Sequence, residues 1–213
     1  MRKVWQEPFL WVHLAGLLAV PFWVALTLIG LATSDPLLPV GLERLLVGLA
    51  GTLPVAWMQA NRPFYIFSIL VVALDPAQLS LQRRRILSAF LGFEEKLLAL
   101  LVSLLLLQLA ERFYQIAPLF QSLSPIHLGV SSRLLGLLIA SVGFWGLNLF
   151  VQVPVAVLRI LLLSDPEFEQ LSPFAVDQVA NQFTIIGQQR TDLWVTGDDP
   201  VPEPPSSEAE SSG

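Results

Sequence analysis

Long apolar runs separated by short polar stretches dominate the hydrophobic pattern of this chain. Four of the runs meet or approach the roughly 20 residues that a helix needs to cross about 30 Å of hydrocarbon. They lie at 8–33, 38–60, 97–117 and 134–158. The first is longer than a signal-peptide core of about 7–15 residues and no A-x-A site follows it, so we expect a retained span. The pattern predicts an all-α polytopic membrane bundle with four transmembrane helices.

A fifth apolar run, at 64–74, is bounded on each side by a proline and is too short to cross a membrane. In a helix its eleven residues would rise about 16 Å, half of a bilayer. Only Ser68 and the Tyr65 hydroxyl interrupt its apolar surface, so it lacks the polar face of a helix that lies on a membrane. We therefore predict a half-membrane helix over 63–74 that tucks partway into the bundle.

A basic segment follows at 77–92 and predicts an amphipathic helix. Its apolar side chains share one helical arc: Leu79, Ile86, Leu87, Phe90 and Leu91. Such a helix suits the surface of an anionic leaflet, with Arg83, Arg84 and Arg85 as membrane-surface residues. Arg83 falls within the apolar arc, where its stem could lie in lipid while its head reaches water. The alternative is that the arginines only keep this segment on the cytoplasmic side.

The chain turns polar after the fourth span. We predict a cytoplasmic segment over 164–196 with one short helix, in which Ser172 is the N-cap and Gly187 the stop. The last residues, 197–213, read "GDDPVPEPPSSEAESSG" and contain no aromatic residue. This composition cannot bury enough surface to fold, so it predicts a disordered acidic tail.

Composition and charge support the membrane assignment and suggest an orientation. Only 14% of the residues are charged and 54% are apolar, whereas soluble domains carry about one quarter charged. With four spans and a cytoplasmic N-terminus, nine basic residues lie inside and three outside, as the preference of Lys and Arg for the cytoplasmic side requires. A fifth span would change that division to seven and five. We expect both termini in the cytoplasm.

Polar residues inside the fourth span follow helical spacing. Ser141, Trp145, Asn148 and Gln152 share one stripe that reaches Arg159 at the cytoplasmic end. Amides in hydrocarbon usually join helices, and Gly136, Gly143 and Gly146 would allow close approach. A substrate path along the stripe is the alternative. The central parts of the spans contain no carboxylate, which disfavours ion-coupled transport.

Charged residues at helix ends predict one specific contact. Glu94 and Glu95 precede the third span, and Arg159 closes the antiparallel fourth span. We expect at least one of the two glutamates to lie near Arg159. Within the apolar run, Arg62 and Tyr65 are the polar groups best placed to contact a neighbouring helix or a partner.

Candidate chemistry is scarce. The chain has no cysteine, which excludes disulfides and thiolate metal sites. It has no catalytic triad, phosphate-binding glycine loop or H-E-x-x-H motif, so we expect no enzyme, cofactor or metal site. Three arginines do not make a nucleic-acid surface. His13 stands alone in the first span, where an interhelical hydrogen bond or an interfacial position competes with a chlorophyll or haem ligand.

Two stretches, "EPFLWVHLAGLLAVP" and "WMQANRPFYIFSILVVALDPAQLSLQRRRIL", resemble the cyanobacterial low-complexity-tail membrane protein family. The resemblance covers the whole chain and implies a cyanobacterial plasma or thylakoid membrane, but no activity or catalytic residue. Two hypotheses therefore remain. One is a non-enzymatic interaction or assembly protein, with other membrane proteins or further copies of the chain as partners. The other is a small transporter or channel formed by oligomerisation.

Overall fold

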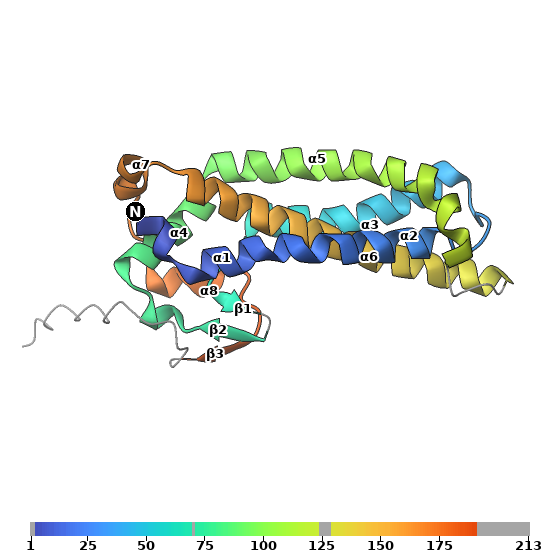
Figure 1. Ribbon diagram of the computed structural model, residues 1–213. Coiled ribbons are helices and arrows are strands. Elements are labelled where there is room, and N and C mark those ends of the chain that lie inside the picture. The colour runs from blue at the N-terminus through green and yellow to red at the C-terminus, as the bar shows by residue number, and fades with distance from the viewer. Residues whose placement is uncertain (1–2, 70, 124–128, 191–213) are drawn as a thin grey trace, which may run out of the picture.

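The computed structural model describes residues 3–69, 71–123 and 129–190 (Figure 1). It is mostly helical, and four helices are long and apolar enough to cross a membrane: Pro8–Leu31, Val40–Asn61, Phe93–Ser122 and Ser132–Leu162. They coincide with the four predicted spans. The predicted tail at 197–213 and residues 191–196 of the predicted cytoplasmic segment lie outside the described residues.

The first candidate span is built from two helices. A short 3-10 helix, Lys3–Gln6, precedes α1 (Pro8–Ala15), and a second, Gly16–Ala19, joins α1 to α2 (Val20–Leu31). Prolines in the first turns of α1 and α2 suit these positions because no intrahelical partner awaits their missing N–H groups. The other long helices are α3 (Val40–Asn61), α5 (Phe93–Ile116), with its 3-10 extension Ala117–Leu123, and α6 (Gly129–Leu162).

The seam between α2 and α6 is held by small residues. A Cβ atom placed on Gly30 would lie 2.5 Å from the Ala140 nitrogen, and one on Gly136 would lie 2.5 Å from the Gly30 oxygen. One on Gly143 would lie 2.7 Å from Thr27. The backbones therefore touch along this seam, which confirms the close approach predicted from the glycines of the fourth span.

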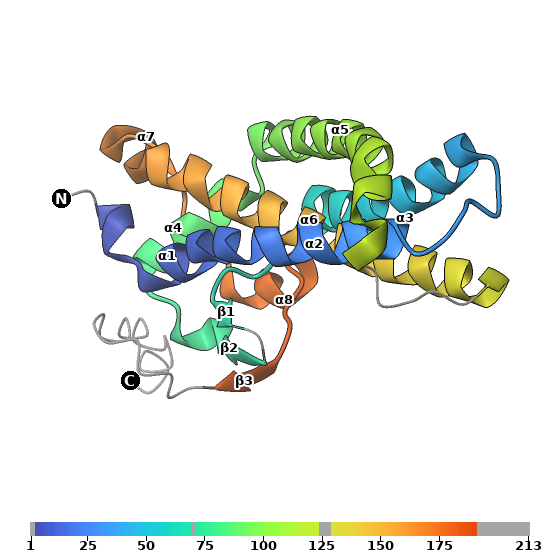
Figure 2. The same ribbon diagram turned by 45° about the vertical axis from the view of Figure 1, so that its right-hand side comes forward.

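The two ends of the bundle differ. At the loop end, residues 32–39 join α2 to α3, and α5 ends in its 3-10 extension. At the cap end, residues 62–92 and 163–190 form a small α/β cap beside the start of α1 and the end of α6 (Figures 1 and 2). Its helices are Pro76–Gln78 (3-10), α4 (Leu81–Phe90), α7 (Asp165–Gln170), Val176–Gln178 (3-10) and α8 (Val179–Gln182).

The cap contains a three-stranded sheet where the half-membrane helix was predicted, so that prediction is wrong. Strand β1 (Ser68–Ile69) pairs antiparallel with β2 (Val72–Leu74), and β2 pairs parallel with β3 (Gln188–Arg190). The chain before β1 is also extended, because Tyr65 N–H donates to the Thr184 carbonyl (3.0 Å). β1 and β2 form a local hairpin, but β3 lies more than a hundred residues further along the chain. A short apolar run cannot be distinguished as helix or strand by periodicity alone.

The amphipathic helix is confirmed, though it is shorter than the predicted 77–92. Ser80 caps α4 by accepting a hydrogen bond from the Arg83 N–H (3.3 Å), and the predicted apolar arc faces the cap core. In the C-terminal segment Ser172 is not an N-cap, since the helical turns begin only at Val176. Gly187 is not a helix stop either: its φ of 106° and the Val71 backbone, 2.4 Å from a Cβ placed there, require glycine beside β2.

Candidate functional site

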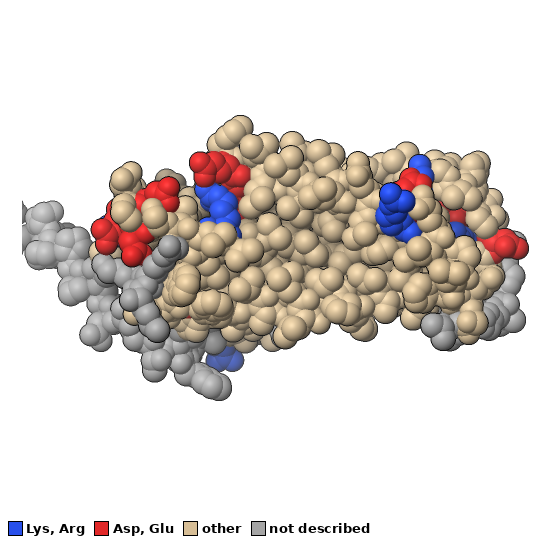
Figure 3. Space-filling view, turned by 45° about the horizontal axis from the view of Figure 1, so that its top comes forward, with Lys and Arg blue, Asp and Glu red and all other residues tan. Residues whose placement is uncertain are grey.

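Charged side chains gather at the two ends of the bundle and leave an apolar band between them (Figure 3). Arg133 and Arg159 mark the two ends on α6. They stand 26 residues apart, a helical rise of about 39 Å. This separation fits a hydrocarbon layer of about 30 Å with charges on both sides.

At the cap end, Arg159 joins α6 to the start of α5. Its Nη1 donates to Glu95 (2.9 Å), and its Nη2 pairs with Glu94. The predicted approach of a glutamate to Arg159 is therefore confirmed for both glutamates. Glu95 is buried and Glu94 is exposed, so the cluster extends from solvent toward the bundle interior.

A line of polar side chains continues inward from this cluster. Gln59 of α3, Glu95 and Gln152 border a cavity of about 10 Å³, which is about the volume that one water molecule needs. Gln152 Nε2 donates to Ser103 Oγ of α5 and to Asn148 Oδ1, both at 3.2 Å. Gln152 thus makes a polar contact between α6 and α5, while Asn148 bonds Gln152 and the Phe144 carbonyl of its own helix.

The rest of the predicted stripe behaves differently. Ser141 Oγ donates to the Leu137 carbonyl of its own helix (2.7 Å), and Trp145 is 43% exposed on the outside of the bundle. Helical spacing therefore placed four residues on one stripe, but only Asn148 and Gln152 lie fully inside.

A second buried ion pair ties the cap to the N-terminal segment. Arg83 Nε donates to Glu7 Oε2 (2.9 Å), and both side chains are buried. The guanidinium also lies 5.9 Å from the centre of the Phe67 ring, within cation–π range. Glu7 Oε1 has no hydrogen-bond partner among the described residues. The prediction of Arg83 as a membrane-surface residue is wrong, because its side chain is buried and paired with Glu7. The sequence pattern did not reveal this carboxylate partner.

The neighbouring cap residues mostly hold the cap together. Arg84 Nε donates to the Phe174 carbonyl (2.6 Å) and Arg62 donates to the Ala180 carbonyl (2.7 Å). Tyr65 is completely buried, and its hydroxyl donates to the Leu74 carbonyl (3.1 Å). Burial raises the pKa of Tyr65. Tyr65 is therefore a core residue of the cap and is not accessible to a partner. Arg85 is half-buried, and its Nε has no partner among the described residues.

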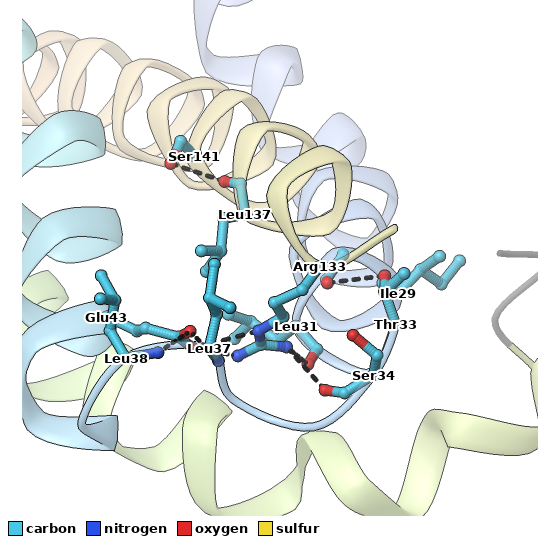
Figure 4. Close-up of polar contacts among 11 residues, drawn as sticks. Ile29, Leu31, Thr33, Ser34, Leu37, Leu38, Glu43, Arg133, Leu137 and Ser141 are labelled. Atoms are coloured by element: carbon cyan, nitrogen blue, oxygen red, sulfur yellow. Dashed lines mark hydrogen bonds and ion pairs between the residues drawn. The ribbon is translucent and has the colours of Figure 1, made fainter. Parts of the chain in front are cut away.

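The loop end is closed by a third buried pair, Glu43 and Arg133 (Figure 4). Glu43 Oε1 accepts hydrogen bonds from the N–H groups of Leu37 (2.8 Å) and Leu38 (3.1 Å). Its Oε2 accepts from Arg133 Nε (3.1 Å), while Arg133 Nη1 donates to the Leu31 carbonyl (2.6 Å). The pair therefore fixes the α2–α3 loop to the first described turns of α6.

His13 lines a cleft of about 280 Å³ between α1, α6 and the cap sheet. Its Nδ1 donates to the Phe9 carbonyl of its own helix (2.8 Å), and its ring lies 5.5 Å from the Phe64 ring. This hydrogen bond is within a helix and not between helices, so of the two expected roles the interfacial position stays a prediction. No group of three His, Asp or Glu side chains in the described part of the chain could hold a metal ion.

Sequence reasoning missed several polar residues of the interior. Gln59 and Ser103 are buried on the spans that face Gln152, and Glu43 and Arg133 are buried at the loop end. A usable signal existed for Glu43, since a carboxylate in the first turn of a helix favours the free N–H groups there. No signal in the sequence paired Glu7 with Arg83, which is 76 residues away.

Four candidate spans with charges confined to their two ends define a multi-pass α-helical membrane protein. The polar contacts within it join helices and do not form a recognisable catalytic arrangement in the described residues. The model of the low-complexity tail membrane protein-like (LCTMP-like) family matches residues 6–194, so the chain belongs to this family. This confirms the resemblance found in the sequence. No match was found among curated proteins or among solved structures.

Proposed function

We propose that this chain is a non-enzymatic interaction protein that helps to assemble or scaffold larger membrane complexes. The observation that carries the proposal is the contact of Gln152 with Ser103 across the α5–α6 interface. Gln152 is engaged with Ser103 and Asn148, and the cavity beside it has room for about one water molecule. Such an interior supports helix packing better than substrate passage.

The distribution of basic residues supports a cytoplasmic cap. Arg62, Arg84, Arg85 and Arg190 belong to the cap, and Arg44, Arg112 and Arg133 belong to the loop end. By the preference of Lys and Arg for the cytoplasmic side, the cap faces the cytoplasm and both termini lie there. Arg84 and Arg85 would then lie close to the anionic leaflet. The resemblance to a cyanobacterial family favours a plasma or thylakoid membrane.

The cap is also the best candidate for partner binding. Strand β3 (Gln188–Arg190) is fully exposed and forms one edge of the sheet. An exposed edge strand can pair with an extended segment of another chain. The loop end offers no comparable sheet edge among the described residues.

Site-specific crosslinking tests this proposal, because the chain contains no cysteine of its own. A photo-crosslinker attached to Gln189→Cys in β3 should join the chain to another membrane protein that co-purifies at a fixed ratio in mild detergent. The matched control is Arg112→Cys, an exposed position at the loop end, which should give no such adduct.

Two results would overturn the assembly role. Adducts only between copies of the chain, recovered as a homo-oligomer, would favour the channel. Equal adducts from both positions would show that the cap end has no special role in partner binding.

A further inference from the structure

The tip of the cap sheet exposes apolar side chains beside the bundle. Ile69 is 37% exposed, Val71 73% and Ile186 47%. In Figure 1 the sheet lies below α1 and α8, at the cap end of the bundle. Large exposed apolar side chains grouped at one position indicate contact with lipid or with a partner.

The depth of this tip follows from α6. The midpoint between Arg133 and Arg159 is residue 146, and about 15 Å of hydrocarbon extends to either side of it. Residues 149–154 of α6 lie about 4 to 12 Å from the midpoint, inside the hydrocarbon. Ile69 and Ile186 line the same cleft as these residues, so the tip reaches the same layer.

Several backbone groups near the tip are paired within the protein. Backbone polar groups at membrane depth need partners within the protein. The Val71 carbonyl accepts from the Gln188 N–H (2.7 Å), and the Ile186 carbonyl accepts from Ser68 Oγ (3.1 Å). Residues Ile69 and Val72 pair across the antiparallel hairpin. The strands then run from the tip toward Arg190, which is exposed on the cap side.

The cleft under the tip, of about 280 Å³, is almost entirely apolar. Its walls include Val12 and Gly16 of the first span, Phe150 and Pro154 of α6, and Ile69 of β1. His13 and Ser68 are its only polar residues. Trp11 is exposed and lies five residues before Gly16 on the first span, toward the cap. Tryptophan at such a position marks the membrane interface.

We propose that the β1–β2 tip is inserted into the hydrocarbon layer and that the cleft beneath it holds one acyl chain of a membrane phospholipid. The cleft is continuous with the lipid-facing surfaces of the first and fourth spans, from which a chain enters sideways. This inference does not depend on the assembly role, because it requires only that the four helices span the membrane.

Spin labelling tests the depth of the tip. The labelled variants Val71→Cys, Leu18→Cys and Gln170→Cys are reconstituted in vesicles of phosphatidylcholine and phosphatidylglycerol. Leu18 is 84% exposed in the middle of the first span, and Gln170 is exposed on α7. The Val71 label should resemble the Leu18 label, accessible to oxygen and shielded from a nickel chelate. A Val71 label that behaves like the Gln170 label would overturn the proposal.

Native mass spectrometry in mild detergent tests the acyl chain. The protein from the same vesicles should retain one phospholipid, and Gly16→Leu, which fills the cleft, should reduce its occupancy at least fivefold. Gly41→Leu is the matched control, because a Cβ atom there meets nothing within 4 Å. If Gly16→Leu does not fold, Ile69→Trp at the rim of the cleft replaces it. Failure of the wild-type protein to retain lipid, equal retention by both variants, or a second copy bound in place of lipid would each overturn the acyl-chain site.

Discussion

Both ends of the molecule contain a buried arginine–glutamate pair, but the two glutamates differ in how many of their oxygens accept hydrogen bonds. At the loop end, both Glu43 oxygens accept hydrogen bonds, from Arg133 and from two backbone N–H groups. At the cap end, Glu7 binds Arg83 through one oxygen, and the other has no partner in the described structure. At the loop end, protein groups thus supply hydrogen bonds to both oxygens of the buried carboxylate. At the cap end, one oxygen of the buried carboxylate has no hydrogen-bond partner among the described residues.

This difference points to the cap end as the place where function constrains the sequence. Among the described residues, the buried charged groups with an unpartnered atom are Glu7 and Arg85, both at the cap end. The other unpartnered atoms, on Trp23, Thr52, Tyr114 and Gln152, belong to neutral side chains. Departures from full hydrogen bonding in native proteins concentrate at functional sites. The comparison thus supports a partner at the cap and a structural role for the loop end.

The largest effect should come from Glu43→Ala. This change leaves the buried Arg133 without its carboxylate and two backbone N–H groups without an acceptor. We expect the free energy of unfolding, measured with denaturant in detergent micelles, to fall by about 3–5 kcal/mol. Arg112→Ala, at an exposed position of the same end, should change it by less than about 0.5 kcal/mol. A loss below about 1 kcal/mol for Glu43→Ala would contradict a closed loop end.

A smaller effect should follow Glu7→Ala at the cap end. The change removes one charge-assisted hydrogen bond, which typically contributes about 1.5–3 kcal/mol. It also removes the unpartnered Oε1 atom, which offsets part of the loss. The buried Arg83 is also left without its carboxylate, as Arg133 is in Glu43→Ala, so we expect a loss of about 3 kcal/mol in the same unfolding experiment, at the low end of the range for a broken buried pair. A loss equal to that of Glu43→Ala would remove the distinction between the two ends.

The sequence predicted well what depends on local pattern and on helix ends. The four spans follow from apolar length, the tight α2–α6 seam from the glycines of the fourth span, and the Arg159 contacts from the positions of charges at antiparallel helix ends. Each of these depends on a few neighbouring residues or on a single topological step. The membrane family was predicted from two stretches, residues 7–21 and 57–87, and the family match confirms it.

The cap could not be predicted because its contacts join distant segments. Within the run at 64–74, β1 and β2 pair with each other, and residues 184–190 supply further hydrogen-bonding partners. The β-branched residues Ile69, Val71 and Val72 suit this hairpin. Arg83 is buried because Glu7 lies beside it in the fold. The apolar run lies beside residues 149–154 of α6, but as a hairpin on the outside of the bundle and not as a helix, and its depth in a membrane stays a prediction.

A modest loss of stability should show whether the buried polar side chains between the two ends of the bundle serve helix packing or transport. Gln152→Leu removes the hydrogen bonds to Ser103 and Asn148. Hydrogen bonds between helices in membranes average about 0.6 kcal/mol, so the free energy of unfolding should fall by roughly that amount. A double-mutant cycle with Ser103→Ala isolates the contact, and Ser141→Ala, whose hydroxyl bonds its own helix, is the control. Passage of ions or solutes that Gln152→Leu abolishes in vesicles would instead support the channel.

The smallest effect concerns the outer rim of the cap, where the contacts are local and exposed. In α7, Ser164 and Glu167 form a capping box, and hydrogen bonds from Ser164 lower the pKa of Glu167. Because the folded-state pKa is lowered, the stabilisation is complete above the ordinary glutamate value of 4.5 and is lost as the pH falls through the lowered value. Hydrogen exchange of the α7 amides, corrected for intrinsic pH dependence, should therefore speed up on acidification relative to amides in the middle of α3. Ser164→Ala removes the hydroxyl but keeps the backbone N–H that donates to Glu167, so it should weaken this pH dependence. An unchanged profile would show that the rim is held by the burial of Phe168 and not by its polar cap.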